Sequence, residues 1–189
     1  AAKVTLTDTE KSIGVYAKNA TGTIKNTGKI SGTGLKESMG IAAEGATITN
    51  EGEVDVEGTK VVGLVAKGTG ATINSNGANS KIKATGSSSA AVYTDQGTIN
   101  LQGGSVDAEG GAIDLYSNNN GMINVSNGGA TAINTGQKSL AFMTANGGKI
   151  NFASPTTATI QGGSDAPSRG TAFYYTPSGL SVTPGTAST

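Results

Sequence analysis

A six-residue phrase returns seven times along this 189-residue chain, and the repeat restricts the fold more than any other feature. The copies read SIGVYA, SMGIAA, VVGLVA, SAAVYT, AIDLYS, SLAFMT and TAFYYT, and they begin at positions 12, 38, 61, 89, 112, 139 and 171. Successive copies therefore start 23 to 32 residues apart, and they align without gaps. A recurring period of this length indicates a solenoid or another repeat architecture.

Two further short apolar runs follow each phrase. The second run is centred on Ile24, Ile48, Ile73, Ile99, Ile123, Ile150 and, less clearly, Leu180. The third is centred on Ile30, Val54, Ile82, Val106 and Ile160, and the unit around residues 131–134 fits the pattern poorly. Three short strands per unit of about 25 residues, separated by Gly, Asn and Ser turns, are typical of one coil of a parallel β-helix.

We therefore predict an all-β fold, a right-handed parallel β-helix with three sides and about seven coils. Residues 12–182 form the coils of a single segment, residues 1–11 form an irregular start, and residues 183–189 form a frayed end. No window places apolar residues at helical spacing, so a helical bundle is excluded. An antiparallel β-sandwich also has many short strands, but it gives no reason for one phrase to return at a regular period.

Side chains alternate along a strand, which sorts the phrase into columns that stack from coil to coil. Two columns are apolar nearly throughout, and we expect both to face inward. The first contains Ile13, Met39, Val62, Ala90, Ile113, Leu140 and Ala172, and the second contains Val15, Ile41, Leu64, Val92, Leu115, Phe142 and Tyr174. An inward column of the second run holds Asn26, Asn50 and Ser75, where amides can form a hydrogen-bonded ladder, and then Leu101, Val125 and Phe152.

The composition excludes several classes of function. Only 35% of residues are hydrophobic, against about 45–50% in an average globular domain, and the narrow stacked core of a solenoid accounts for the difference. The chain has no His and no Cys, which removes the usual zinc ligands, the thiol nucleophile and the imidazole base. Its 13 basic and 13 acidic residues cancel, so no charge excess points to nucleic acid. We expect no cofactor and no bound metal.

The wording of the repeats resembles a group of bacterial surface proteins. SIGVYAKNATGTIKNTGKISG at residues 12–32 and SMGIAAEGATITNEGEV at residues 38–54 are similar to passenger-domain repeats of the large type V autotransporter adhesins of fusobacteria, the RadD-like family. The similarity covers most of the chain and is closest in the first three units. It implies a segment of a longer passenger on the cell surface, held at the outer membrane by a C-terminal β-barrel absent from this sequence. The implied partner is a receptor on host cells or other bacteria, either protein or glycan.

Two outward columns are expected between and beside the inward ones. The first consists of mostly small residues: Gly14, Gly40, Gly63, Ala91, Asp114, Ala141 and Phe173. The second carries four of the five tyrosines: Tyr16, Ala42, Val65, Tyr93, Tyr116, Met143 and Tyr175. Exposed tyrosines can stack on sugar rings or anchor a protein partner. Aromatic residues also favour strands and stack along a rod without any ligand. We take Tyr16, Tyr93, Tyr116 and Tyr175 as candidate ligand-binding residues, and we expect no catalytic residue.

Charged residues gather in the first part of the chain. Lys29, Glu53 and Lys81 share one outward column of the third run, so the sign of the charge alternates from coil to coil. Such pairs are typical of surfaces that fix the register of neighbouring strands. The acidic residues near Glu53 also suggest Ca²⁺, although alternate residues of a strand do not wrap an ion as a loop does.

These observations predict a non-enzymatic surface adhesin segment, a rigid extracellular stalk that contributes to attachment. Two alternatives stay open. One is a purely structural spacer. The other is a carbohydrate-active enzyme, a lyase or hydrolase, because enzymes of this kind use the same fold with paired carboxylates or a basic side chain. The insertion at residues 154–170 is a second candidate contact surface.

Overall fold

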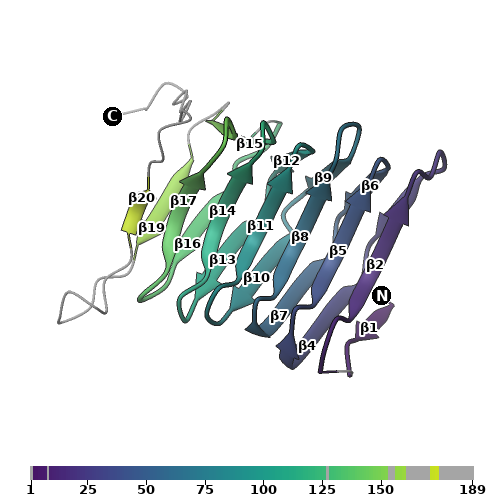
Figure 1. Cartoon of the computed structure of the whole chain (residues 1–189), viewed down its shortest axis with the longest axis horizontal. Coiled ribbons are helices and arrows are strands. Elements are labelled where there is room, and N and C mark those ends of the chain that lie inside the picture. Colours follow the sequence, from purple (N-terminus) through teal and green to yellow (C-terminus); the bar gives the residue numbers. More distant parts are fainter. Residues whose placement is uncertain (1, 8, 127, 153–155, 161–170, 175–189) are drawn as a thin grey trace.

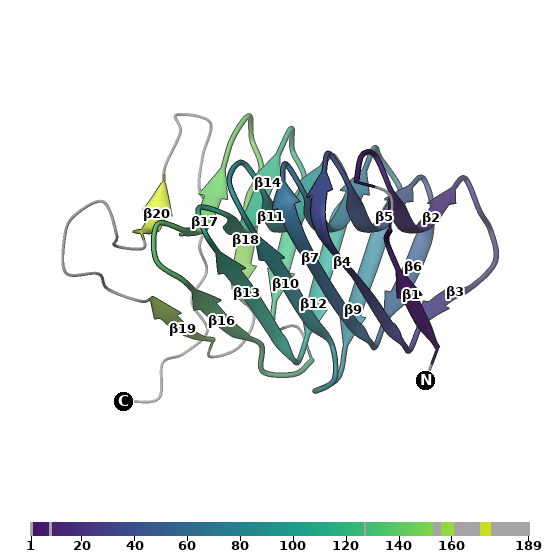
Figure 2. The same cartoon turned by 90° about the horizontal axis from the view of Figure 1, so that it is seen from below.

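The computed structural model describes residues 2–7, 9–126, 128–152, 156–160 and 171–174, and at 157, 160 and 171–174 it describes the backbone alone. Regular structure in this part of the chain is entirely β-strand, arranged as a rod of three parallel sheets with β1 and β20 toward opposite ends (Figures 1 and 2). Among these residues, none belongs to a helix of the length and apolarity that crossing a membrane requires. The predicted all-β, three-sided parallel β-helix is confirmed.

Every third strand in the sequence joins the same sheet. Sheet A contains β1 (Lys3–Thr5), β4 (Lys29–Lys36), β7 (Glu53–Thr59), β10 (Lys81–Thr85), β13 (Ser105–Glu109), β16 (Ala132–Thr135) and β19 (Thr157–Ile160). Sheet B contains β2 (Ile13–Lys18), β5 (Met39–Glu44), β8 (Val62–Lys67), β11 (Ala90–Asp95), β14 (Ile113–Asn118), β17 (Leu140–Thr144) and β20 (Thr171–Tyr174). Sheet C contains β3 (Ile24–Asn26), β6 (Thr47–Asn50), β9 (Thr72–Asn76), β12 (Thr98–Gln102), β15 (Met122–Val125) and β18 (Lys149–Phe152).

One coil passes through sheet B, then sheet C, then sheet A. Coil 1 is β2, β3 and β4, and coil 6 is β17, β18 and β19, so the described residues complete six coils of the seven predicted. A seventh coil begins with β20, and its remaining residues, including Leu180, lie outside the described part of the chain. The predicted frayed end at 183–189 and most of the 154–170 insertion also lie outside it.

Equivalent residues pair directly from coil to coil. In sheet C, Ile48 is in register with Ile73, and Ile73 with Ile99. In sheet A, Val106 is in register with Ile133, which is completely buried, so the unit around 131–134 follows the repeat after all. The expected irregular start contains β1, which pairs in parallel with β4. β1 has only the three residues Lys3–Thr5, too few to show an alternating pattern in the sequence.

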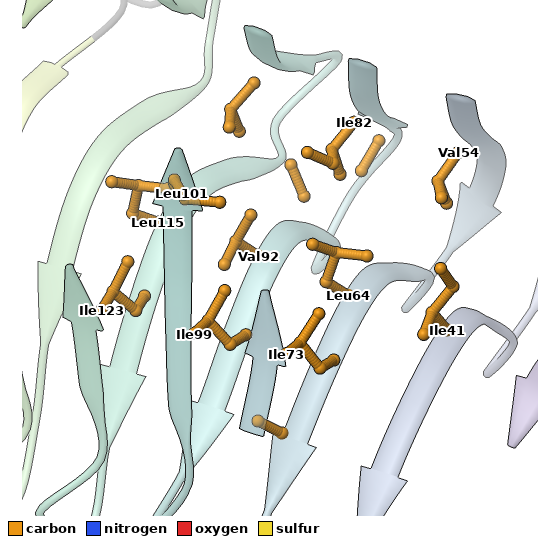
Figure 3. Packing of buried hydrophobic residues seen from close by; sticks show 14 of the residues in the cluster. Ile41, Val54, Leu64, Ile73, Ile82, Val92, Ile99, Leu101, Leu115 and Ile123 are labelled. Atoms are coloured by element: carbon orange, nitrogen blue, oxygen red, sulfur yellow. The ribbon is translucent and has the colours of Figure 1, made fainter. Parts of the chain in front are cut away.

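The core is a column of branched aliphatic side chains along the axis of the rod. Residues from all three sheets meet there, as Figure 3 shows for Leu64, Ile73 and Ile82. Each is at most 1% exposed. Because each coil stacks on an almost identical coil, every apolar column is covered by its own neighbours, and few hydrophobic residues close the core.

The inner column of sheet C changes character along the rod as predicted. Asn26 donates through Nδ2 to Oδ1 of Asn50 at 2.8 Å, and Asn50 donates to the hydroxyls of Ser75 at 3.3 Å and Ser80 at 3.0 Å. Leu101, Val125 and Phe152 then continue the column and are buried. Hydrogen bonds between coils make the buried amide of Asn50 acceptable in the core.

The phase of the repeated phrase differs from the prediction at its second and third positions. The first apolar column, Ile13 to Leu140, lies on the outside of sheet B, where Ile13 is 42% exposed. The small-residue column, Gly14 to Ala141, faces inward instead, and Ala91 and Asp114 are completely buried. The second predicted inward column, represented by Ile41 and Leu64, is buried as expected. The prediction was therefore wrong for two columns: the first apolar column faces outward, and the small-residue column faces inward.

A bend within each phrase causes this change of phase. Direct pairing in sheet B includes the second and fourth positions of the phrase, as in Ala90 with Ile113 and Val92 with Leu115, but skips the third. The third and fourth positions consequently both face inward. A Cβ added at Gly40 would clash with a side-chain carbon of Val54, so the third position has room for small residues only. A strict two-residue alternation cannot predict such a bend.

Candidate functional site

The outer face of sheet B brings together most of the tyrosines that the sequence singled out. Its strands lie side by side with no other described element over them (Figure 1). We call this surface the sheet B face and define it by the outward side chains of two columns. The first is Ile13, Met39, Val62, Ala90, Ile113 and Leu140, and the second is Tyr16, Ala42, Val65, Tyr93, Tyr116 and Met143.

The tyrosines of this face fall into two separate places. Tyr93 and Tyr116 are neighbours on β11 and β14, with ring centroids 5.1 Å apart and planes tilted by 53°. Tyr16 lies on β2 and is 50% exposed, and Ala42 and Val65 on the two intervening strands separate it from Tyr93. The predicted row is therefore one aromatic pair and one distant tyrosine.

Tyr175 does not belong to the described residues, and the register of the last phrase differs from the gapless alignment. β20 pairs with β17 so that Phe173 lies opposite Phe142 and Tyr174 lies opposite Met143. The prediction placed Tyr175 beside Met143, one residue too late. The interval before this copy, 32 residues from position 139 to position 171, is the longest in the repeat.

Polar side chains border the tyrosines at the end of each sheet B strand. The hydroxyl of Tyr16 donates to Glu44 Oε2 at 2.8 Å, and this hydrogen bond to a carboxylate raises the pKa of Tyr16. Asn118 Nδ2 donates to the hydroxyl of Tyr93 at 3.5 Å, and burial raises the pKa of Tyr116. Both shifts are upward from 10.0, so Tyr16 and Tyr116 are neutral phenols at physiological pH.

The charged residues of the face form one column at the strand ends. It reads Lys18, Glu44, Lys67, Asp95 and Asn118 from coil 1 to coil 5. Lys18 binds Glu44 at 2.8 Å, and this contact, with the hydroxyl of Tyr16 second, lowers the pKa of Glu44. Asp95 accepts a hydrogen bond from Asn119 Nδ2 at 2.9 Å. The column alternates in sign through its first four members.

The outer face of sheet A carries the predicted alternating ion pairs. Lys29 Nζ lies 2.7 Å from Glu53 and 3.6 Å from Asp55, and Lys83 lies 3.1 Å from Glu109. Glu51, next to this face, binds Lys25 at 2.8 Å. The acidic residues suggested as a Ca²⁺ site are thus largely engaged by lysines, and no group of three metal-ligating side chains forms among the described residues.

A surface hollow of about 520 Å³ lies on sheet A near β1 and is lined in part by Lys3, Lys29 and Asp55. Among the described residues that line it, Asp55 is the one carboxylate, and Lys29 already contacts it. A glycosidase requires two carboxylates on either side of the bond that it cleaves. The described part of the lining does not contain this pair.

Asp114 is the most unusual ionisable residue of the described part, and the sequence placed it on the surface. It occupies the small-residue column of β14 and is completely buried. Its Oδ2 accepts a hydrogen bond of 2.5 Å from Thr135, whereas Oδ1 has no hydrogen-bond partner among the described residues. Burial raises the pKa of Asp114 to about 8, although the bond from Thr135 acts in the opposite direction. No feature of the phrase AIDLYS signals this burial, because its alternation puts Asp114 outside.

Comparison with known proteins gives no further assignment. No family model, no curated protein and no solved structure matches this chain.

Proposed function

We propose that this chain is a non-enzymatic segment of a bacterial surface adhesin, a rigid extracellular stalk that takes part in attachment to host cells or other bacteria. The observation that carries the proposal is a stiff β-solenoid with one apolar outer face, the sheet B face, and two polar ones. Parallel coils that stack in register resist bending, which suits a stalk that holds a contact surface away from a membrane. The resemblance of its repeats to type V autotransporter passengers supports the same function.

The contact surface in this proposal is the sheet B face around Tyr93 and Tyr116. Tyrosine offers a large contact area, and ordering it on binding costs little side-chain entropy. Asp95 and Asn118 at its border supply hydrogen-bonding groups for a protein or glycan receptor. A purely structural spacer has no need of an apolar face, and an enzyme needs a pair of free acidic groups beside a cleft.

Competition with cells tests the proposal. Purified chain is added to a bacterial aggregation assay and to a host-cell binding assay, and inhibition is measured against concentration. The double variant Tyr93→Ala, Tyr116→Ala should lose inhibition, whereas Asn100→Ala and Asn124→Ala on the outer face of sheet C should retain it.

Failure of the unaltered chain to bind or inhibit would leave the structural spacer as the function. Release of reducing or unsaturated sugars from a polysaccharide panel would instead establish the enzyme.

A further inference from the structure

The parallel β-helix fold does not require the sheet B face to be apolar. Its two defining columns hold twelve residues, all of them aliphatic, aromatic or Met. Corresponding outward columns of sheet A hold Lys29, Glu53 and Lys81, and those of sheet C hold Asn74 and Asn100. The same backbone therefore accepts polar outer columns. A contiguous apolar surface on one side only marks an interaction surface.

Side-chain size divides the sheet B face into two halves. On β5 and β8 the second column holds the small residues Ala42 and Val65, both 5% exposed. On β11 and β14 the same column holds Tyr93 and Tyr116, which stand against each other as a pair. One half of the face is therefore low, and the other is raised by two aromatic rings.

The charged column beside the face has a matching asymmetry. Lys67 on β8 and Asp95 on β11 are in register, yet neither forms an ion pair within the described part of the chain. Glu44 lies one strand before Lys67, and the uncharged Asn118 lies one strand after Asp95. If a second copy of this column lies against the first in reverse order, Lys67 is opposite Asp95 and Glu44 is opposite the amide of Asn118.

We propose that the sheet B face binds the sheet B face of a second copy of this chain, with the two rods antiparallel. The two-fold axis lies parallel to the strands, between β8 and β11. This symmetry sets β8 against the partner's β11, β5 against its β14, and β2 against its β17, as an isologous interface requires. Val65 then meets a copy of Tyr93, Ala42 meets a copy of Tyr116, and Lys67 meets a copy of Asp95.

The pairing matches shape, polarity and charge at the same time. The raised tyrosine half of each copy covers the low half of the other, so the small residues receive the aromatic rings. The first column packs apolar residues on apolar residues, with Met39 opposite Ile113 and Val62 opposite Ala90. Any shift of the axis by half a strand spacing would place Asp95 or Lys67 opposite its own copy, and repulsion between like charges disfavours that arrangement.

The size of the face is sufficient for a specific, weak dimer. Strands of six residues are about 20 Å long, and six strands spaced by about 4.8 Å cover about 29 Å, which gives roughly 600 Å² per copy. Specific interfaces begin at about 1,200 Å² summed over both partners. Sheets also pack face to face in this way within β-sandwiches, about 10 Å apart.

The inferred geometry refines the proposed function, and this step rests on it. Rods that project from two facing cells meet in antiparallel orientation. Pairing through the sheet B face would therefore link two cells that carry the same protein, in addition to any attachment to a different receptor.

Sedimentation of the purified chain over a range of concentrations tests the pairing without cells. We expect a reversible dimer, and Tyr93→Ala should weaken it about tenfold, as the loss of a central aromatic anchor does. Lys67→Glu and Asp95→Lys should each weaken it because they create like-charge contacts. The double variant Lys67→Glu, Asp95→Lys should restore the dimer, because each contact then joins opposite charges again. Thr98→Lys, on the outer face of sheet C, is the control that leaves the dimer unchanged.

Cross-linking decides the orientation. The chain has no Cys, so Tyr16→Cys and Met143→Cys each introduce a single thiol. A mixture of the two variants should form a mixed disulfide dimer, because β2 faces the partner's β17. Neither variant alone should cross-link efficiently, since identical positions on these outer strands are about 24 Å apart in the dimer.

The outcomes separate this inference from the function on which it rests. The pairing is overturned if the unaltered chain is a monomer at all concentrations. It is also overturned if the double variant Lys67→Glu, Asp95→Lys dimerises no better than the single variants. A monomer that still inhibits cell attachment through Tyr93 and Tyr116 retains the adhesin and assigns the face to a different receptor. A dimer without any effect on cells establishes the pairing and removes the adhesive function.

Discussion

The first three coils and the last three described coils share one backbone but are stabilised by different side chains. In coils 1–3, ion pairs such as Lys25 with Glu51 and Lys60 with Glu37 connect neighbouring strands. Further along the rod, amides connect them, with Asn100 donating to Asn74 at 2.8 Å and Asn124 donating to Asn100 at 2.8 Å. Aromatic contacts also appear only in the later coils of the described chain.

The interior differs between the two halves as well. Gly40 and Gly63 occupy the small-residue column in the first half, and Ala91, Asp114 and Ala141 occupy it in the second. Parallel strand pairing continues through both halves, with one register shift in the first half, between Gly32 and Leu35 of β4. The comparison therefore shows that a parallel β-helix fixes the space and the direction of each position, whereas the chemistry at that position can change within three coils.

A large effect is expected at Asp114, the one buried acid among the described residues of the second half. Its folded pKa of about 8 lies above the value of about 3.9 in an unfolded chain, so the folded state binds the proton more tightly. The stabilising contribution of this proton is complete below about pH 4 and is lost as the pH rises to about 8. Glu44, whose pKa is lowered by Lys18, acts in the opposite direction. Its contribution to stability is lost as the pH falls through its folded pKa.

Replacing Asp114 with the Ala of neighbouring coils should therefore stabilise the chain at pH 7. The gain is of the order of 2–4 kcal/mol, because the removed ionisation penalty is partly offset by the lost partner of Thr135. Urea unfolding at pH 5 and pH 8.5 measures the effect. The unaltered chain should be more stable at pH 5, and Asp114→Ala should reduce this difference. Equal stability of the unaltered chain at both pH values would contradict the burial of an ionisable Asp114.

The inner column of sheet C provides a direct comparison of apolar and amide packing. Leu101→Ala, in the second half, should destabilise the chain by about 2–5 kcal/mol through loss of buried carbon and a residual cavity. Asn50→Ala, in the first half, should cost about 1–3 kcal/mol because the hydroxyls of Ser75 and Ser80 lose a donor. Urea unfolding at constant pH compares the two. A larger loss from Asn50→Ala would show that the amide ladder is the stronger stabiliser.

The small-residue column of the first half should not tolerate enlargement. Gly40→Ala places a methyl group against Val54 and the carbonyl oxygen of Gly63, and overpacking of this kind costs about 1–3 kcal/mol. Gly22→Ala is the matched control, since no atom lies within 4 Å of its added Cβ. Thermal unfolding of both variants gives the comparison. Equal melting temperatures would mean that the first half adjusts its spacing to the larger residue.

The smallest effect is expected at the surface. Lys29→Met removes two contacts to acidic side chains, but Lys29 is 40% exposed and such pairs contribute about 0.2–1 kcal/mol. Asn100→Ala should have a similarly small effect in the second half. Salt distinguishes them: 1 M NaCl should reduce the difference between Lys29→Met and the unaltered chain, whereas the Asn100→Ala difference should persist. An Asn100 effect that also disappears in salt would remove this distinction between the halves.

The sequence alone determined the architecture, because a repeated phrase can bury its apolar columns only by stacking copies of itself. The register of Ile48, Ile73 and Ile99, the ion pairs of Lys29 and the change from Asn50 to Leu101 all follow from this stacking. The tyrosine pair of Tyr93 and Tyr116 was also placed correctly on neighbouring outer positions.

The tertiary structure alone decided which side of sheet B two of the columns face. A bend inside each strand puts two successive residues inward, so Met39 and Ile113 lie on the surface and Asp114 lies in the core. Apolar residues suit a core and a contact surface equally well, and sequence periodicity carries no record of where a strand bends. At the bend, Gly40 of sheet B lies close against Val54 of sheet A, so the packing there involves residues from separate strands.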